Sequence, residues 1–298
     1  MRIGGAIYSG ESILPIFAEC RVPYRYVRMA DNVVRLANTT RGVWVGVIAA
    51  AALLTPVRVL TAQTVSPTPG FLQDVGLQVP VSKHFSIEPQ VQFSTQGTSG
   101  DGNPYAYAHG LQFRPWIHYD GIRNVTVTGA VSYIYYFTVP GTSYYRHPEW
   151  RFTTFGTLTQ SLNGGSLYQQ LRFELLSFRA SNGSVQQLPR VRVRFGQNLY
   201  FGEHSSKPYL GLYEEAIAQF PQPSYSKVYF QGARFFAGYG FEYEKRVVLL
   251  LGFKAEAEVS SSGSTVTLFY GPAFSVEYRF GKDKVNAKHQ RTTAFKDF

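Results

Sequence analysis

The chain has 298 residues and a formal net charge of +10 at pH 7. The charge is concentrated at the two ends, because residues 1–62 hold seven Lys/Arg against three Asp/Glu and residues 281–298 hold five against two. The stretch 63–280 holds 17 against 14. Phosphate neutralisation needs Lys and Arg clustered on the folded domain, so this distribution argues against a nucleic-acid-binding protein.

The N-terminal region has the pattern of an export signal. An apolar run at residues 43–54 follows Arg35 and Arg41 and ends before Pro56. It is too short for a transmembrane anchor, which needs about 18–20 apolar residues. A basic segment, a short apolar core and a small residue at the exit predict a secretory signal peptide that is cleaved after Ala62.

Residues 1–28 are long and arginine-rich for a signal sequence and have no apolar core of their own. Translation from Met29 would give a basic segment of ordinary length. We therefore interpret 1–28 as sequence upstream of the true start and 29–62 as the signal peptide. Cys20, the single cysteine, would then be absent from the product, so we expect no disulfide and no lipid attached to a cysteine.

From residue 63 onward, apolar and polar residues alternate with the period of two that is typical of strands. Short turns alternate with longer links rich in Gly, Pro, Ser and Asn, an asymmetry that is typical of outer-membrane barrels. We predict strands at residues 71–81, 85–95, 105–119, 123–138, 148–160, 166–179, 189–201, 208–219, 227–244, 246–259 and 264–280.

The strand at residues 190–195 (RVRVRF) shows the alternation most clearly, with three guanidinium groups on one face and three apolar side chains on the other. Residues 171–175 and 274–280 follow the same pattern. We predict an all-β protein, with residues 63–280 forming an antiparallel transmembrane β-barrel whose apolar residues face lipid and whose charged residues face the lumen. The competing class is a secreted soluble barrel or sandwich, which would bury the apolar face inside.

The number of strands is set by a parity argument. Eleven segments are recognised, whereas bacterial single-chain barrels have even strand numbers. If the last strand ends in the periplasm at Phe280, counting back makes the segment 71–81 begin outside, on the wrong side for an exported N-terminus. We therefore predict twelve strands, with one not recognised, or ten if 71–81 is not in the wall. Residues 281–298 are interpreted as a polar periplasmic tail.

Several short motifs resemble the DUF2490 family of bacterial outer-membrane proteins of unassigned activity, over residues 70–280. These motifs are Pro148-Glu149-Trp150-Arg151, Gln170-Leu171-Arg172-Phe173-Glu174, Pro189-Arg190-Val191-Arg192-Val193-Arg194, Glu214-Glu215 after Pro208-Tyr209, and the strand from Gln231 to Tyr243 with Arg234. The C-terminal tail departs from the family pattern. The resemblance implies a barrel and an envelope location, and it supplies no catalytic residue.

Charged residues on three consecutive strands are predicted to line one wall of the lumen. They are Arg172, Glu174, Arg190, Arg192, Arg194 and Glu214. One interpretation is that they pair and fill a narrow barrel, and the other is that they form an anion-attracting constriction. Because unpaired charges in a narrow lumen are costly, we favour pairing. The lumen would then be largely occluded, since open channels are typical of barrels with about 16–18 strands.

Candidate catalytic and metal sites are weak. None of the six histidines has a metal-ligand spacing, so we expect no metal and no other cofactor. His147, near Ser143 and Glu149, is the one local cluster that contains a nucleophile, a base and an acid, but it lies in an expected loop where polar residues are ordinary. Residues 101–103 (DGN) are interpreted as a turn rather than a calcium site, because too few oxygen ligands accompany them.

We therefore expect no enzyme and predict a structural role or a narrow passage in the bacterial outer membrane. A small-solute channel is the alternative, followed by a barrel-embedded hydrolase. The expected partners are outer-membrane lipid and the barrel-assembly machinery, which reads terminal strands that end in phenylalanine, as residues 274–280 do. The sequence indicates no other protein partner and no particular solute.

Overall fold

The computed structural model describes residues 64–98, 102–139, 148–162, 164–180, 183–201, 208–220, 229–244, 246–260 and 265–280. All of them belong to the second of two compact units, Pro56–Phe298, and the first unit is Met1–Thr55. The predicted upstream segment 1–28, the signal peptide 29–62 and the tail 281–298 lie outside the described residues.

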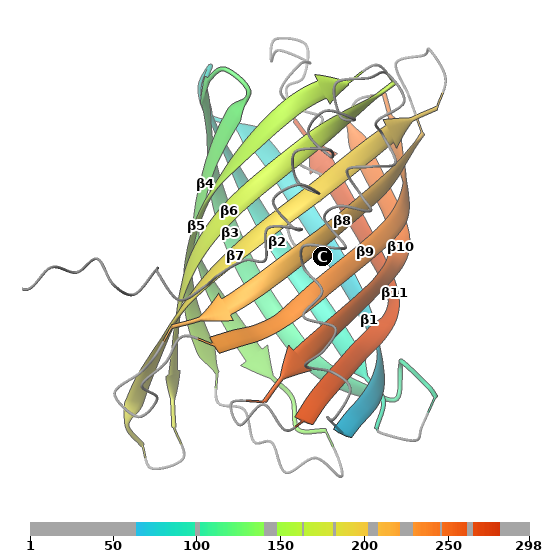
Figure 1. The fold of residues 1–298 in the computed structure, drawn as a ribbon. Coiled ribbons are helices and arrows are strands. Elements are labelled where there is room, and N and C mark those ends of the chain that lie inside the picture. Colours follow the sequence, from blue (N-terminus) through green and yellow to red (C-terminus); the bar gives the residue numbers. More distant parts are fainter. Residues whose placement is uncertain are drawn as a thin grey trace, which may run out of the picture. The chain divides into compact units, whose positions relative to one another are not determined.

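The described residues form one sheet of eleven strands that closes into a barrel (Figure 1). The strands are β1 (Thr64–Pro80), β2 (Phe85–Gln96), β3 (Tyr107–Ile122), β4 (Val125–Tyr136), β5 (Glu149–Leu162), β6 (Gly165–Arg179), β7 (Val185–Tyr200), β8 (Tyr209–Gln219), β9 (Tyr229–Tyr243), β10 (Val247–Val259) and β11 (Thr265–Arg279). Each predicted segment corresponds to one strand, so the all-β barrel is confirmed.

The predicted strand number of twelve, or ten, is wrong. Consecutive strands pair antiparallel, but the barrel closes through a parallel pair of β1 and β11. An even number is required only when the closing pair is antiparallel, because strands of an up-and-down sheet alternate in direction. The segment 71–81 belongs to the wall as part of β1, and no further strand is needed for closure.

The connections at one end of the barrel are shorter than those at the other end, with the exception of the β7–β8 connection. We call the end with the connections β1–β2, β3–β4, β5–β6, β7–β8 and β9–β10 the short-turn end. The opposite end, with the connections β2–β3, β4–β5, β6–β7, β8–β9 and β10–β11, is the long-loop end. Both β1 and β11 run from the long-loop end to the short-turn end.

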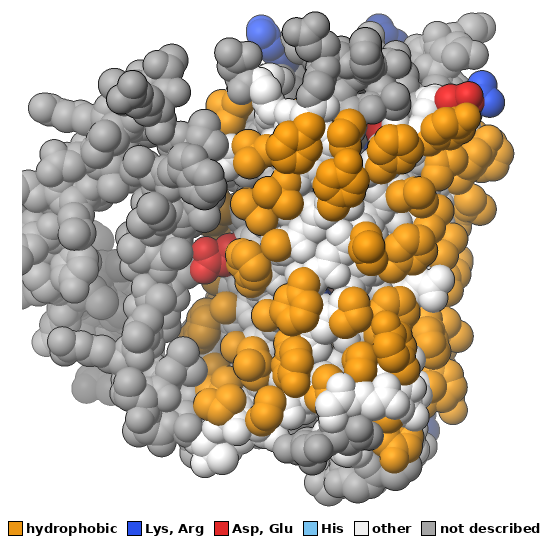
Figure 2. Space-filling model, turned by 90° about the vertical axis from the view of Figure 1, so that its right-hand side faces the viewer, with side chains coloured by type: hydrophobic (Ala, Val, Ile, Leu, Met, Phe, Trp, Pro, Cys, Tyr) orange, Lys and Arg blue, Asp and Glu red, His pale blue; other side chains and the backbone are white. Residues whose placement is uncertain are grey.

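The outer wall is apolar and the inner wall is polar. Large outward side chains such as Phe113, Leu171 and Leu251 are 47–61% exposed, whereas inward Arg114 and Arg172 are at most 4% exposed. Figure 2 shows hydrophobic side chains along the outer wall on the side that carries β10 and β11. The alternation of one strand therefore becomes two surfaces of opposite character, as the period-two pattern requires.

Aromatic side chains fill the lumen toward the short-turn end. The buried cluster consists of Tyr168, Tyr209, Tyr213, Phe236, Leu250 and Ala273. Glycines on neighbouring strands make room for the rings, since a Cβ at Gly196 or Gly240 would lie 2.1 Å from the ring of Tyr168 or Tyr209. The glycine at position 240 thus permits close packing of the Tyr209 ring.

Candidate functional site

The structure brings five of the six predicted lumenal charges together. Arg172, Glu174, Arg190, Arg192 and Arg194 are all inward-facing and buried. They lie on the neighbouring strands β6 and β7, where Arg172 is the register partner of Arg192 and Glu174 that of Arg190. The predicted pairing across one wall is therefore present in the fold.

The assignment of Glu214 to the lumen is wrong, and the neighbouring Glu215 takes that place. Glu215 is fully buried and is the register partner of Arg194, whereas Glu214 is partly exposed and pairs with the outward Phe195. Two successive glutamates leave the phase of the strand undetermined in the sequence. In the structure, the phase of β8 is shown by Tyr213 and Ile217, which both point inward.

Glu174 is the first centre of the lumenal interactions. Its Oε2 accepts hydrogen bonds from Nε and Nη2 of Arg190 at 3.1 and 2.7 Å. Its Oε1 accepts one from Nη1 of Arg192 at 3.0 Å, and Nη1 of Arg172 lies 3.6 Å from the same oxygen. One carboxylate therefore serves three guanidinium groups.

Glu215 is the second centre. Its Oε1 accepts from Nε of Arg192 at 2.6 Å, and its Oε2 accepts from Nε of Arg194 at 2.8 Å. Nη1 of Arg234, on β9, lies 3.6 Å from Oε1. Because Arg192 contacts both Glu174 and Glu215, the two centres are continuous.

Glu256 on β10 is the third centre, and sequence reasoning missed it. It pairs with Nη2 of Arg234 at 2.5 Å and with Nζ of Lys254 at 2.7 Å. The residues 254–258 (KAEAE) have the same period-two pattern of charges as residues 190–195. That pattern was the signal that could have placed Lys254, Glu256 and Glu258 on the inner wall.

These residues form what we call the lumenal charge network. Its members are Arg172, Glu174, Arg190, Arg192, Arg194, Glu215, Arg234, Lys254 and Glu256. Six of them are cations and three are carboxylates. Among the described residues, the network thus combines close ion pairs with an excess of positive charge in a region with little access to water, where charges interact strongly.

The opposite part of the inner wall uses separate pairs instead. Nη2 of Arg114 donates to Oδ2 of Asp74 at 2.7 Å. The ring Nε2 of His118 lies 3.1 Å from Oε2 of Glu88. The indole N–H of Trp116 donates to the side-chain oxygen of Gln90 at 2.6 Å. These interactions fix the inward side chains of β1, β2 and β3.

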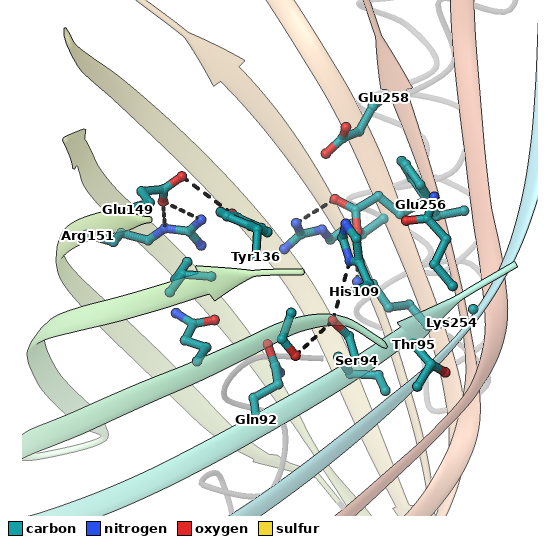
Figure 3. Close-up of a pocket in the computed structure, with 18 of the residues that line it drawn as sticks. Gln92, Ser94, Thr95, His109, Tyr136, Glu149, Arg151, Lys254, Glu256 and Glu258 are labelled. Carbon is teal, nitrogen blue, oxygen red and sulfur yellow. Dashed lines mark hydrogen bonds and ion pairs between the residues drawn. The ribbon is translucent and has the colours of Figure 1, made fainter. Parts of the chain in front are cut away.

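A cavity of about 630 Å³ lies in the lumen toward the long-loop end. Arg190, Arg234, Lys254 and Glu256 of the charge network contribute to its lining, and so does Glu258. Figure 3 shows Lys254, Glu256 and Glu258 on one side of the cavity. These four members of the charge network are therefore accessible to a small solute from this cavity.

The other side of the cavity carries a second ion pair (Figure 3). Nε and Nη2 of Arg151 donate to Oε1 of Glu149 at 2.9 and 2.7 Å. Ser94 Oγ and His109 Nδ1 lie 3.4 Å apart between the two charged sides. The lining thus combines cations, carboxylates and neutral hydrogen-bonding groups, which suits the binding of a polar or charged group.

The sequence candidates for catalysis and calcium binding lie partly outside the described residues. His147 and Ser143 lie outside the described residues, as does Asp101. Asn103 Oδ1 accepts the backbone N–H of Tyr105 at 3.0 Å, the arrangement of an Asx turn, which agrees with the turn interpretation. Within the part of the chain that the structure describes, no group of three or more His, Cys, Asp or Glu is placed to hold a metal ion.

Comparisons with known proteins identify the family. The model of a family described as "Protein of unknown function (DUF2490)" matches residues 70–265, which include every member of the lumenal charge network. No curated protein matches the chain. The chain belongs to the DUF2490 family, as its motifs predicted. Among the described residues, no helix is long and apolar enough to span a membrane.

Proposed function

We propose that this member of the DUF2490 family is a bacterial outer-membrane β-barrel, exported by its signal peptide, whose lumen is closed to axial passage and keeps a binding cavity toward the long-loop end. The observation that carries the proposal is the inverted distribution of side chains, apolar outside and charged inside. A soluble barrel buries its apolar face, because exposing a continuous apolar wall to water is costly.

The dimensions of the wall support insertion into a bilayer. The strands have 11–17 residues, and a tilted transmembrane strand needs about 9–11. Aromatic pairs lie toward both ends of the wall, as in the girdles at the two boundaries between lipid and water. Tyr133 with Trp150 and Tyr135 with Phe137 lie toward the long-loop end, and Phe85 with Tyr119 and Tyr278 with Phe280 toward the short-turn end.

The filling of the lumen supports a closed barrel rather than a channel. The charge network and, beyond it, the aromatic cluster lie between the cavity and the short-turn end, and most of their side chains are buried. Open aqueous lumens belong to wider barrels of about 16–18 strands. We therefore assign no axial transport and no enzymatic activity to the protein, and place its function in the cavity.

Two measurements test the barrel and its closure. We expect the protein to fractionate with the outer membrane and to migrate differently on gels before and after boiling. We also expect low conductance in planar bilayers, which rises when Arg192 and Arg194 are both replaced by alanine, because the replacement removes two guanidinium groups from the middle of the lumen. The matched control is Glu214→Ala on the outer face, which should leave the conductance unchanged.

Folded protein recovered from the soluble periplasm without detergent would refute the membrane barrel. Large and stable conductance of the unmodified protein would favour the small-solute channel instead. Among the described residues, the proximity of Ser94 Oγ and His109 Nδ1 favours the hydrolase alternative. Ester hydrolysis that disappears in His109→Ala would establish it against our assignment.

A further inference from the structure

The seam between β1 and β11 is interrupted at one level. Register pairing continues to Pro69, is absent at Gly70 and Phe71, and resumes at Leu72. On the β11 side of the interruption lies Pro272, which has no backbone N–H and cannot donate a hydrogen bond to β1. The barrel therefore has a local weak point in the strand pair that closes it.

Two glycines bring the backbones together at this point. A Cβ on Gly271 would lie 1.7 Å from the carbonyl oxygen of Gly70, and Gly271 has a φ of +155°. Only glycine fits such an approach. The two strands are thus in contact at this level through bare backbone, without side chains between them and without register pairing.

The cavity reaches this interruption. Its lining includes Gly70, Phe71 and Leu72 of β1 and residues 269–272 of β11, which are the segments on both sides of the unpaired level. This side of the cavity is formed by apolar and small residues. If β1 and β11 separated here, an alkyl chain passing between them would lead from the lumen to the apolar outer surface of the barrel.

Another side of the cavity carries the positive charge. Lys254, Arg234 and Arg190 line it and belong to the charge network, in which six cations face three carboxylates. The charged residues that line the cavity are five cations, Arg151, Arg179, Arg190, Arg234 and Lys254, and three carboxylates, Glu149, Glu256 and Glu258. Among these residues an excess of two positive charges remains, which an anion in the cavity would offset.

We propose that the cavity binds an amphiphile with an anionic head group. The head lies against Lys254 and Arg234, and the alkyl chain leaves the barrel between β1 and β11 at Gly70 and Gly271. The proposal rests on the membrane barrel of the proposed function, because the chain needs lipid around the wall. Since the lumen is filled between the cavity and the short-turn end, the alkyl chain reaches apolar surroundings through the seam between β1 and β11.

Binding of dansyl-labelled undecanoic acid to the full-length barrel in neutral detergent tests the head-group site. Lys254→Gln should weaken binding about tenfold, the magnitude of a lost hydrogen bond between charged partners. This variant leaves Glu256 paired with Arg234. Glu258→Gln, four residues further along β10, should strengthen binding, because it removes a negative charge from the cavity lining. Lys83→Gln in the exposed β1–β2 turn is the matched control and should bind as the unmodified protein does.

A disulfide across the seam tests the route of the alkyl chain. Ser66 and Thr267 are register partners nearer the long-loop end and do not line the cavity. Adjacent strands have the separation that a disulfide needs. In a Cys20→Ser background, the variant Ser66→Cys/Thr267→Cys should bind the probe normally when reduced. The oxidised form should bind at least about tenfold more slowly, because separating β1 from β11 then has to strain a covalent bond.

Competition experiments identify the source of the ligand. Dodecyl phosphate should displace the probe, and inorganic phosphate at equal concentration should not. If phospholipid co-purifies with the barrel and the probe displaces it, the ligand is a membrane lipid. If the barrel binds an amphiphile only when one is added, the ligand is a solute. Both results support the proposal.

Displacement by inorganic phosphate equal to that by dodecyl phosphate would show that the ligand need not be an amphiphile and would overturn the proposal. Equal affinity of Lys254→Gln and the unmodified protein would overturn the head-group site. Binding to the oxidised variant at the normal rate would overturn the route between β1 and β11. Heat-modifiable migration is measured on the same samples. A barrel that folds but does not bind the probe therefore refutes this inference and leaves the barrel intact.

Discussion

The two halves of the lumen share the same strands but differ in how they are occupied. Toward the short-turn end, aromatic rings stand over glycines on the neighbouring strands and fill the interior. Toward the long-loop end, the inner wall carries smaller residues such as Ser94, Gly110 and Gly271, and a cavity remains. At eleven strands the barrel is narrow enough for side-chain size at inward positions to decide whether a section of it is filled.

The charges of the inner wall show a second difference. On β1 and β3, Asp74 forms an ion pair with Arg114, whereas on β8 Glu215 is shared among Arg192, Arg194 and Arg234. A shared carboxylate stabilises several buried cations at once. The network should therefore be sensitive to the loss of one shared carboxylate, and three sets of variants test how the lumen is paired and filled.

The largest effect is expected from Glu215→Ala. It leaves the buried guanidinium groups of Arg192, Arg194 and Arg234 without the carboxylate they share, and breaking a buried pair costs about 3–5 kcal/mol. The free energy of unfolding in urea, for barrels refolded in the same detergent, measures it. Glu214→Ala, one residue earlier on the outer face, is the control and should not destabilise the barrel; equal losses would contradict the inward placement of Glu215.

A smaller loss is expected from Gly240→Ala in the filled half. The added Cβ would lie 2.1 Å from the ring of Tyr209, so the ring must move within packed surroundings. Such overpacking costs about 1–3 kcal/mol, and we expect the upper part of this range. Gly156→Ala is the control, because no atom lies within 4 Å of its Cβ position. The same urea titration checks both, and a stable Gly240→Ala would show that the filled half is loosely packed.

The smallest difference is expected between two glutamine variants. Gln90→Met removes the acceptor of the buried Trp116 indole N–H, at a cost of about 1–2 kcal/mol. Gln231→Met, in the cavity lining, should change stability by less than about 0.5 kcal/mol, since the side-chain oxygen of Gln231 has no hydrogen-bond partner among the described residues. The two variants are compared by the temperature at which half of the protein loses its heat-modifiable migration. A greater loss from Gln231→Met would reverse the comparison between the two halves.

Much of the wall could be predicted from the sequence, because the period of two is a local property of a strand. The strand segments and the lumenal placement of Arg190, Arg192 and Arg194 follow from it. Glu214 was misplaced because a pair of identical residues carries no phase. The charges of residues 254–258 also alternate with a period of two, but this pattern was not recognised as a sign that they face the lumen.

The strand number could not be obtained in the same way. Local alternation does not specify which two strands meet at the closure or in which direction they run, because that depends on pairing between residues about 200 positions apart in β1 and β11. The parity argument assumed an antiparallel closure and therefore gave twelve or ten strands.

The sequence by itself determined which face is apolar on strands with a clear alternation, such as β7, and with it an all-β protein whose charges gather on one wall. Only the tertiary structure decided that Glu215 and Glu256 join Arg192 and Arg234 in one network, that rings close one half of the lumen, and that the cavity meets the interrupted seam. The physical reason is that alternation is encoded by neighbours along the chain, whereas side-chain pairing, filling and closure depend on register between strands that come together only in the folded barrel.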